Sequence, residues 1–103
     1  MPPRSLQFLA LVERSPDNEL FRFSLAQALL AEGQSEAAAP HFAFCIAKKS
    51  DWMMPHILLG KIHLGAHRTN AARPLLETAL QLAIDQAHEE PERELRALLA
   101  DLR

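Results

Sequence analysis

The sequence predicts an all-α protein built from antiparallel helical hairpins, and three observations support this prediction. The helix-favouring residues Ala, Leu, Glu and Arg dominate the 103 residues, whereas Val is almost absent and Tyr does not occur. Apolar side chains recur at spacings of three and four. The chain also resembles itself when it is shifted by 34 residues, so that Leu25 matches Leu59 and Pro40 matches Pro74. A fixed period of this length is typical of arrays in which each hairpin buries its apolar face against its neighbour.

We expect six helices, of which the first spans about residues 4–14. Asp17 or Asn18 then caps the second helix, because either side chain can accept a hydrogen bond from a free amide of the first turn. This helix runs to about Glu32, and Gly33 ends it by adopting a left-handed backbone conformation. The inward faces of these two helices are expected to carry Leu6, Leu9 or Phe8, Val12, Leu20, Leu25, Ala26 and Leu29.

The third helix is expected to follow a capping Ser35 and to end near Lys49, where a cation suits the negative end of the helix dipole. The fourth begins at Met53 or Met54 and ends near Ala66. The inward residues of these two helices are expected to be Ala37, Ala38, Ala39, Phe42, Cys45, Ile46, Leu58, Leu59, Gly60 and Ile62.

The fifth helix is expected to be capped by Thr69 or Asn70 and to extend at most to His88. Pro91 begins the sixth, because a missing amide is harmless in a first turn and the flanking glutamates suit the positive end of the dipole. The sixth helix has one polar and one apolar face. This pattern is typical of a terminal cap.

Pro40 and Pro74 occupy matching positions, each five residues after an expected cap, Ser35 or Thr69. A proline inside a helix costs about 3 kcal/mol, whereas one in the first turn costs little. We therefore expect these helices to start one residue away from the expected caps or to bend slightly. The matching placement itself supports a repeat.

These residues resemble the tetratricopeptide repeat, whose 34-residue unit reads W-x2-L-G-x2-Y, then A-x3-F, then P. The resemblance is carried by Arg22-x2-Leu25-Ala26-x2-Leu29 with Ala38-x3-Phe42, by His56-x2-Leu59-Gly60-x2-His63 with Ala72-x3-Leu76, and by Phe8 followed by Pro16. It covers about residues 4–86. The sequence departs from the repeat's aromatic residues and proline at Arg22, Leu29, His56, His63, Ser50 and Ile84.

The resemblance implies one domain over residues 1–103, folded as a tetratricopeptide-like α-α superhelix. Its parts are expected to be a half repeat at 4–18, a first repeat at 19–52, a second repeat at 53–86 and a capping helix at 91–102.

In tetratricopeptide arrays the first helix of each hairpin lines a concave groove. By that resemblance, the groove residues are expected to be Leu20, Phe23, Gln27, Leu30, Met54, Ile57, Lys61 and Leu64. If they are exposed, this apolar strip with one cation suits a helix or an extended segment of a partner. The alternative is that several of them, especially Leu20 and Leu64, belong to the core, or that the chain's own termini fill the groove. Some members of the family bind C-terminal carboxylates with polar side chains in the groove. This binding is not expected here, because the apolar residues Phe23 and Leu58 occupy matching positions.

We therefore expect a non-catalytic protein-interaction module for a protein or peptide partner whose identity the sequence does not give. The alternative is an assembly element that uses the groove or the exposed face of the first helix, so the chain is expected to be a monomer or a weak homo-oligomer. A metal-dependent enzyme is the least favoured hypothesis. His56, His63 and His67 share one helix face, but no carboxylate or second cysteine completes a zinc site. Cys45 is expected to be a packed thiol rather than a nucleophile.

Charge and composition argue against several other classes. The formal net charge is −2, with acids and bases interspersed, so a nucleic-acid partner is not expected. No stretch approaches 18 uncharged apolar residues, so no membrane association is expected. The chain's start lacks the features of a secretory signal and its single cysteine suits a reducing compartment, so we expect a cytoplasmic location. We assign no catalytic residue, metal or cofactor.

Overall fold

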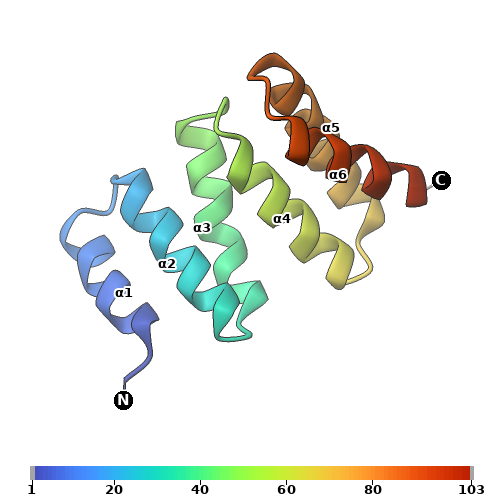
Figure 1. The fold of residues 1–103 in the computed structure, drawn as a ribbon. Helices are drawn as coiled ribbons and strands as arrows, with labels where there is room; N and C mark the ends of the chain where they lie inside the picture. The colour runs from blue at the N-terminus through green and yellow to red at the C-terminus, as the bar shows by residue number, and fades with distance from the viewer. Residues whose placement is uncertain (1, 103) are drawn as a thin grey trace. The chain divides into compact units, whose positions relative to one another are not determined.

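The computed structural model describes residues 2–102, and this range contains six α-helices and no β-strand (Figure 1). The helices are α1 (Arg4–Arg14), α2 (Glu19–Ala31), α3 (Ser35–Lys48), α4 (Met53–Gly65), α5 (Thr69–Asp85) and α6 (Glu89–Asp101). They fall into two compact units, one of α1 to α3 that ends at Ser50 and one of α4 to α6 that begins at Asp51. The all-helical prediction is confirmed, whereas the extents of the single domain and of its repeats stay predictions.

In the first unit, α2 and α3 form a hairpin and α1 packs against α2. The apolar stripes of these helices leave water together, which is the main favourable term in such packing. Fully buried Phe42 of α3 contacts Phe23 of α2 edge to face, with ring centroids 5.7 Å apart. The buried apolar residues of this unit are Val12, Leu25, Ala26, Ala38, Phe42 and Cys45.

In the second unit, α4 and α5 form a hairpin and α6 packs against α5. Gly60 allows close approach of the two hairpin helices, because a Cβ at this position would lie 2.7 Å from Cδ2 of the buried Leu76. Leu95 of α6 belongs to the same core, so the last helix closes this unit. The core cluster consists of Met53, Ile57, Ala72, Leu76, Ala79, Ala83 and Leu95.

Equivalent positions of the two hairpins have equivalent burial, which supports the 34-residue register. Ala38 and Ala72 are both fully buried, and so are Cys45 and Ala79. Small residues at these four positions let the helices of a hairpin pack closely.

The turns inside the hairpins repeat as well. Gly33 and His67, 34 residues apart, have positive φ values of 79° and 61°. The backbone N–H of the next residue, Gln34 or Arg68, donates at 2.8 Å to the carbonyl five residues earlier, which is the Schellman arrangement. The prediction that Gly33 ends its helix is confirmed, and Ala87, with φ 58°, repeats the geometry after α5.

The predicted caps have mixed outcomes. Asn18 caps α2, because its Oδ1 accepts a hydrogen bond at 3.0 Å from the backbone N–H three residues later. The predicted caps Ser35 and Thr69 are wrong, since both are the first helical residues of α3 and α5. The carbonyls of Gln34 and Arg68 accept the first helical hydrogen bonds, so these residues take the capping position.

Pro40 and Pro74 are each the sixth residue of their helices, one position deeper than expected from the caps. Each therefore removes one helical hydrogen bond at the same place in the repeat. Pro91 is the third residue of α6, which begins at Glu89, so it lies in the first turn and removes none. Helix α5 ends at Asp85, three residues before its expected limit.

The predicted inward stripe of α1 is partly wrong. Leu6 and Leu9 are 52% and 41% exposed, whereas Ser5 and Val12 are buried. The reason is a polar contact between helices: the backbone N–H and Oγ of Ser5 donate to the carboxylate of Glu32 at 3.0 and 2.7 Å. These bonds hold the Ser5 face of α1 against the end of α2 and leave the two leucines outside.

Candidate functional site

Four of the predicted groove residues lie on α2. Leu20 is 62% exposed, so the alternative that places it in the core is wrong. Gln27 is exposed as well, and Leu30 is half-buried. Phe23 is also half-buried, with its ring against Phe42. Helix α2 therefore presents an apolar side chain and an amide to solvent.

The other four predicted groove residues lie on α4, in the second unit. Met54 is 36% exposed, but Ile57 is only 6% exposed and belongs to the core cluster, which corrects its expected exposure. Lys61 Nζ lies 2.6 Å from Glu94 Oε1, so its charge is paired with α6. Leu64 is partly buried and packs against the core cluster, which agrees with the alternative that assigned it to the core. A groove shared by the α2 and α4 residues stays a prediction.

Arg22 stands where the repeat has its first aromatic residue. Its guanidinium lies 4.3 Å from the centroid of the Phe44 ring, and its Nε donates to the Pro16 carbonyl at 2.9 Å. Its Nη1 is 3.4 Å from Nδ1 of His41. Burial and then the charge of Arg22 lower the pKa of His41. Arg22 thus connects the loop before α2 with α3, through its hydrogen bond to Pro16 and its cation–π contact with Phe44.

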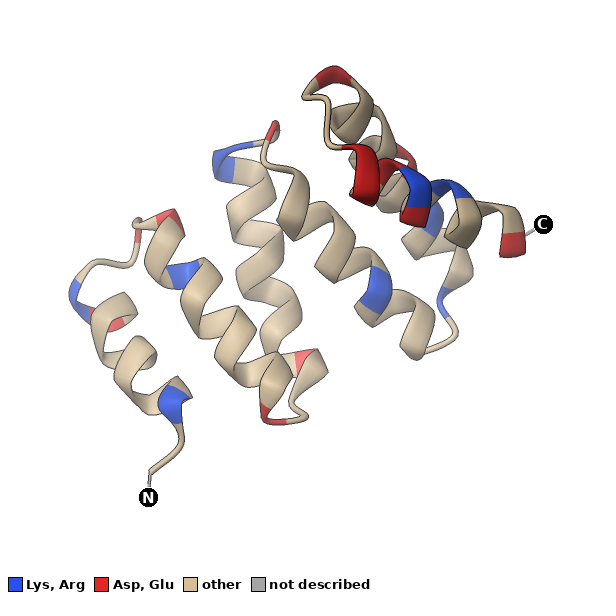
Figure 2. Cartoon of the chain, in the orientation of Figure 1, with Lys and Arg blue, Asp and Glu red and all other residues tan. Residues whose placement is uncertain are grey.

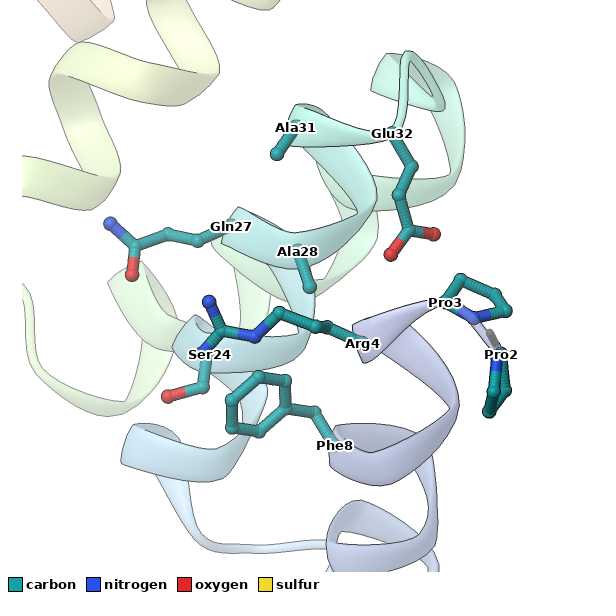
Figure 3. Close-up of a pocket in the computed structure, with 9 residues that line it drawn as sticks. All are labelled: Pro2, Pro3, Arg4, Phe8, Ser24, Gln27, Ala28, Ala31 and Glu32. Atoms are coloured by element: carbon teal, nitrogen blue, oxygen red, sulfur yellow. The ribbon is translucent and has the colours of Figure 1, made fainter.

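A cavity of about 600 Å³ lies between α1 and α2, within the first unit. Figure 3 shows its lining, with Phe8 and Arg4 extending from α1 toward α2. Phe8 is half-buried, and short side chains on α2 leave the space open. The lining residues are Pro2, Pro3, Arg4, Phe8, Ser24, Gln27, Ala28, Ala31 and Glu32.

Charge is unevenly distributed around this cavity. Both carboxylate oxygens of Glu32 accept hydrogen bonds from Ser5. The Arg4 guanidinium lies 5.7 Å from the centroid of the Phe8 ring, a cation–π distance. No hydrogen bond or ion pair joins the Arg4 side chain to another described residue. The cavity therefore offers a cation that has no acidic partner among residues 2–102.

Sequence reasoning missed this cavity, apart from Gln27. The sequence does carry a signal for it, because Ser24, Ala28 and Ala31 share one face of α2 at spacings of four and three. Small residues on the face that meets α1 predict a space, but only if Phe8 rather than Leu9 is known to point inward.

The structure places two of the histidines considered as metal ligands, and it places Cys45. His56 is buried, and Nδ1 of His63 accepts a hydrogen bond at 2.8 Å from Nε of Arg68. Within residues 2–102, no three His, Cys, Asp or Glu side chains gather closely enough to hold a metal ion. Cys45 is fully buried, and its Sγ lies 3.4 Å from the Glu19 carbonyl. Burial raises the pKa of this thiol to about 11.

Charged residues form no basic patch on the described helices. Figure 2 shows Lys and Arg spread over several helices, whereas acidic residues gather at the start of α6. Glu89, Glu90 and Glu92 lie in that first turn, where the helix dipole favours them. In the part of the chain that the structure describes, no helix has both the length and the apolar character to cross a bilayer.

Comparison with known proteins bears on the family of this chain. No family model matches the sequence. The chain is 29% identical over 92 residues to a TPR repeat-containing protein of Pseudomonas aeruginosa, and the alignment covers 89% of this chain and 88% of that protein. This similarity supports a tetratricopeptide-type family for the chain. Its all-helical fold is consistent with the α-α superhelix of that family, as the sequence predicted.

For a tetratricopeptide-type protein, the coarse functional expectation is interaction with other proteins, because stacked hairpins present extended binding surfaces. The similarity therefore supports a role of this kind. Among the described residues, the exposed large apolar side chains are Leu6, Leu9, Leu20, Met54 and Ile84, and Gln27 is exposed as well.

Proposed function

We propose that this protein is a non-catalytic interaction module that docks a peptide or a helix of a partner on the predicted groove residues of α2 and α4. The observation that carries this proposal is the exposure of Leu20, a large apolar side chain that is 62% exposed. Burying a leucine completely contributes about 1.5–3 kcal/mol, so a partner that covers it gains affinity. Met54, 36% exposed, adds an adaptable thioether.

The non-catalytic part of the proposal is supported by the kind of protein that the chain resembles and by the state of its thiol. A nucleophilic cysteine needs an accessible, low-pKa thiol. Cys45 has neither property, because it is fully buried and its pKa is raised to about 11.

The proposal is tested by affinity capture from native lysate, comparing the wild type with Leu20→Glu and Met54→Glu. Both side chains are exposed, so we expect circular dichroism and thermal melting to stay close to wild type while specific capture is lost. Ile84→Glu is the matched control, because Ile84 is 39% exposed on α5, outside the predicted groove. Capture that survives both groove substitutions but fails with Ile84→Glu contradicts the proposal.

A second candidate function is homo-oligomerisation through the outer face of α1. It is favoured by the exposure of Leu6 and Leu9, 52% and 41%, on adjacent turns of one helix. Light scattering over a range of protein concentrations tests it. Association that Leu6→Glu abolishes supports this candidate, and a monomer at every concentration removes it.

A further inference from the structure

We propose that the cavity between α1 and α2 binds an acidic, apolar peptide segment of a partner protein, and that a carboxylate of this segment pairs with Arg4. The proposal rests on the interaction function proposed above and specifies the chemistry of the partner. The cavity shares only Gln27 with the predicted groove positions, and the rest of its described lining comes from the start of the chain, from α1 and from the α2 face that meets α1.

The size and the walls of the cavity suit a peptide segment. Its volume of about 600 Å³ falls in the range of about 300–1,000 Å³ that is usual for ligand pockets. Phe8 forms one wall, and the short side chains of Ala28 and Ala31 form another (Figure 3). An aliphatic or aromatic side chain that enters the cavity leaves water and contacts these apolar groups.

The polar groups of the cavity set the charge of the occupant. Arg4, Ser24 and Gln27 each carry a side-chain N–H or O–H group, and no hydrogen bond joins any of these side chains to another described residue. Arg4 also has no acidic neighbour within ion-pair distance among the described residues. A carboxylate can accept hydrogen bonds from several donors at once, and guanidinium–carboxylate pairs are among the strongest in proteins.

Glu32 leaves the Arg4 side of the cavity to the cation, because Figure 3 shows the Glu32 carboxylate on the side of Pro3, away from the Arg4 guanidinium. It is the one acidic residue in the described lining, and it already accepts two hydrogen bonds from Ser5 at the start of α1. A basic occupant would meet Arg4 and would have to compete for Glu32 with these two bonds. An acidic occupant meets Arg4 without disturbing the contact that holds α1 to α2.

The test uses a displayed library of random 12-residue peptides selected on the immobilised full chain. We expect the recovered peptides to be enriched in Asp or Glu beside Leu, Ile or Phe. Their affinity for Arg4→Gln should be about ten-fold lower than for the wild type, because a charge-assisted hydrogen bond is lost. Arg14→Gln is the matched control, since Arg14 lies exposed on the same helix outside the cavity, and it should leave affinity unchanged.

Two further variants locate the binding site. Ala28→Trp is designed to fill the cavity, and Gln27→Glu adds a negative charge at an exposed position of its lining. Both should weaken the selected peptides about ten-fold or more, with melting curves recorded for each variant. Replacing the acid of the peptide by its amide should cost affinity with the wild type but little with Arg4→Gln. This non-additivity is the signature of a direct pair.

Several results overturn the proposal. Selected peptides without acidic residues, peptides that bind Arg4→Gln as well as the wild type, or no recovered peptides would each do so. Self-association that Ala28→Trp abolishes would show that a second copy of the chain fills the cavity instead. Failure here is distinguishable from failure of the interaction function, because capture that depends on Leu20 can persist when the cavity variants have no effect.

Discussion

At the residue scale, Gly60 is the clearest case in which the fold depends on one missing side chain. A Cβ at Gly60 would lie 2.7 and 2.9 Å from Cδ2 and Cγ of Leu76, a side chain that is fully buried. Alanine favours a helix over glycine by about 1 kcal/mol, whereas overpacking a core costs about 1–3 kcal/mol. We expect Gly60→Ala to lower the free energy of unfolding by about 1 kcal/mol, measured by urea denaturation.

Gly65 provides the matched control for Gly60. It ends the same helix, and nothing lies within 4 Å of a Cβ built at this position. Gly65→Ala should therefore leave stability unchanged or raise it by up to about 1 kcal/mol. If both substitutions stabilise the protein equally, the close approach between Gly60 and Leu76 is not real.

Cys45 should be chemically inert in the folded protein. Its side chain is fully buried, and burial, followed by the nearby Glu19 carboxylate, raises its pKa to about 11. The thiolate is the reactive form, so both effects slow alkylation. We expect iodoacetamide to modify Cys45 more than about 100-fold faster in concentrated guanidinium chloride than in buffer, as followed by mass spectrometry. Comparable rates in the two conditions would contradict the buried position.

His41 should make the stability of the first unit depend on pH. Its pKa in the fold is lowered from 6.5, first by burial and then by Arg22. The unfolded chain therefore binds more protons than the folded one below about pH 6.5, so stability falls as the pH decreases through this window. We expect the melting temperature of the wild type to fall more between about pH 7.5 and 5.5 than that of His41→Gln. Parallel curves for the two proteins would rule this out.

At the element scale, α1 is attached to α2 by a polar contact as well as by apolar packing. Glu32 accepts hydrogen bonds at 3.0 and 2.7 Å from the backbone N–H and Oγ of Ser5, in the first turn of α1. The carboxylate thus does for α1 what a capping side chain does locally for other helices. We expect Glu32→Ala to lower stability by about 1–2 kcal/mol.

The control for Glu32 is Glu13→Ala, because Glu13 is exposed on α1 and lies far from the helix start. Hydrogen exchange should show faster opening of α1 amides in Glu32→Ala and no change in Glu13→Ala. An equal effect of both substitutions would mean that net charge, rather than this contact, is responsible.

The elements themselves followed from the sequence because their signals are local. The helix periodicity, Asn18 and Gly33 gave boundaries that the structure confirms, and α1 covers the expected residues 4–14. The expected caps Ser35 and Thr69 failed, because the carbonyl of the preceding residue can open a helix without any side-chain signal.

The exposure of the candidate site residues was harder to predict, because it depends on contacts distant in sequence. Met54 and Ile57 are both apolar and three residues apart, yet Ile57 lies in a core completed by Leu95 of α6. In the same way, Ser5 is buried only because Glu32, 27 residues later, accepts its hydrogen bonds. Helical periodicity describes a stripe but does not say which neighbour covers it.

At the scale of the whole molecule, each of the two units consists of one hairpin and a third helix that packs against it, but the units expose different groups. The strongest helix contacts within each unit join helices that follow one another in sequence. Stability in such proteins is approximately a sum of local terms, so surface substitutions should act on binding without disturbing the rest. Leu20 in the first unit and Met54 in the second are therefore suitable reporters of partner binding.

The most direct measurement of the central claim is NMR titration of the isotope-labelled 11.5 kDa chain with the partner recovered by capture. If the protein docks partners on the predicted groove residues, the largest chemical-shift changes should fall on amides of α2 and of the first turns of α4, around Leu20 and Met54. Leu20→Glu should abolish these changes. Shifts confined to α3 and α5, unchanged by Leu20→Glu, would contradict the claim.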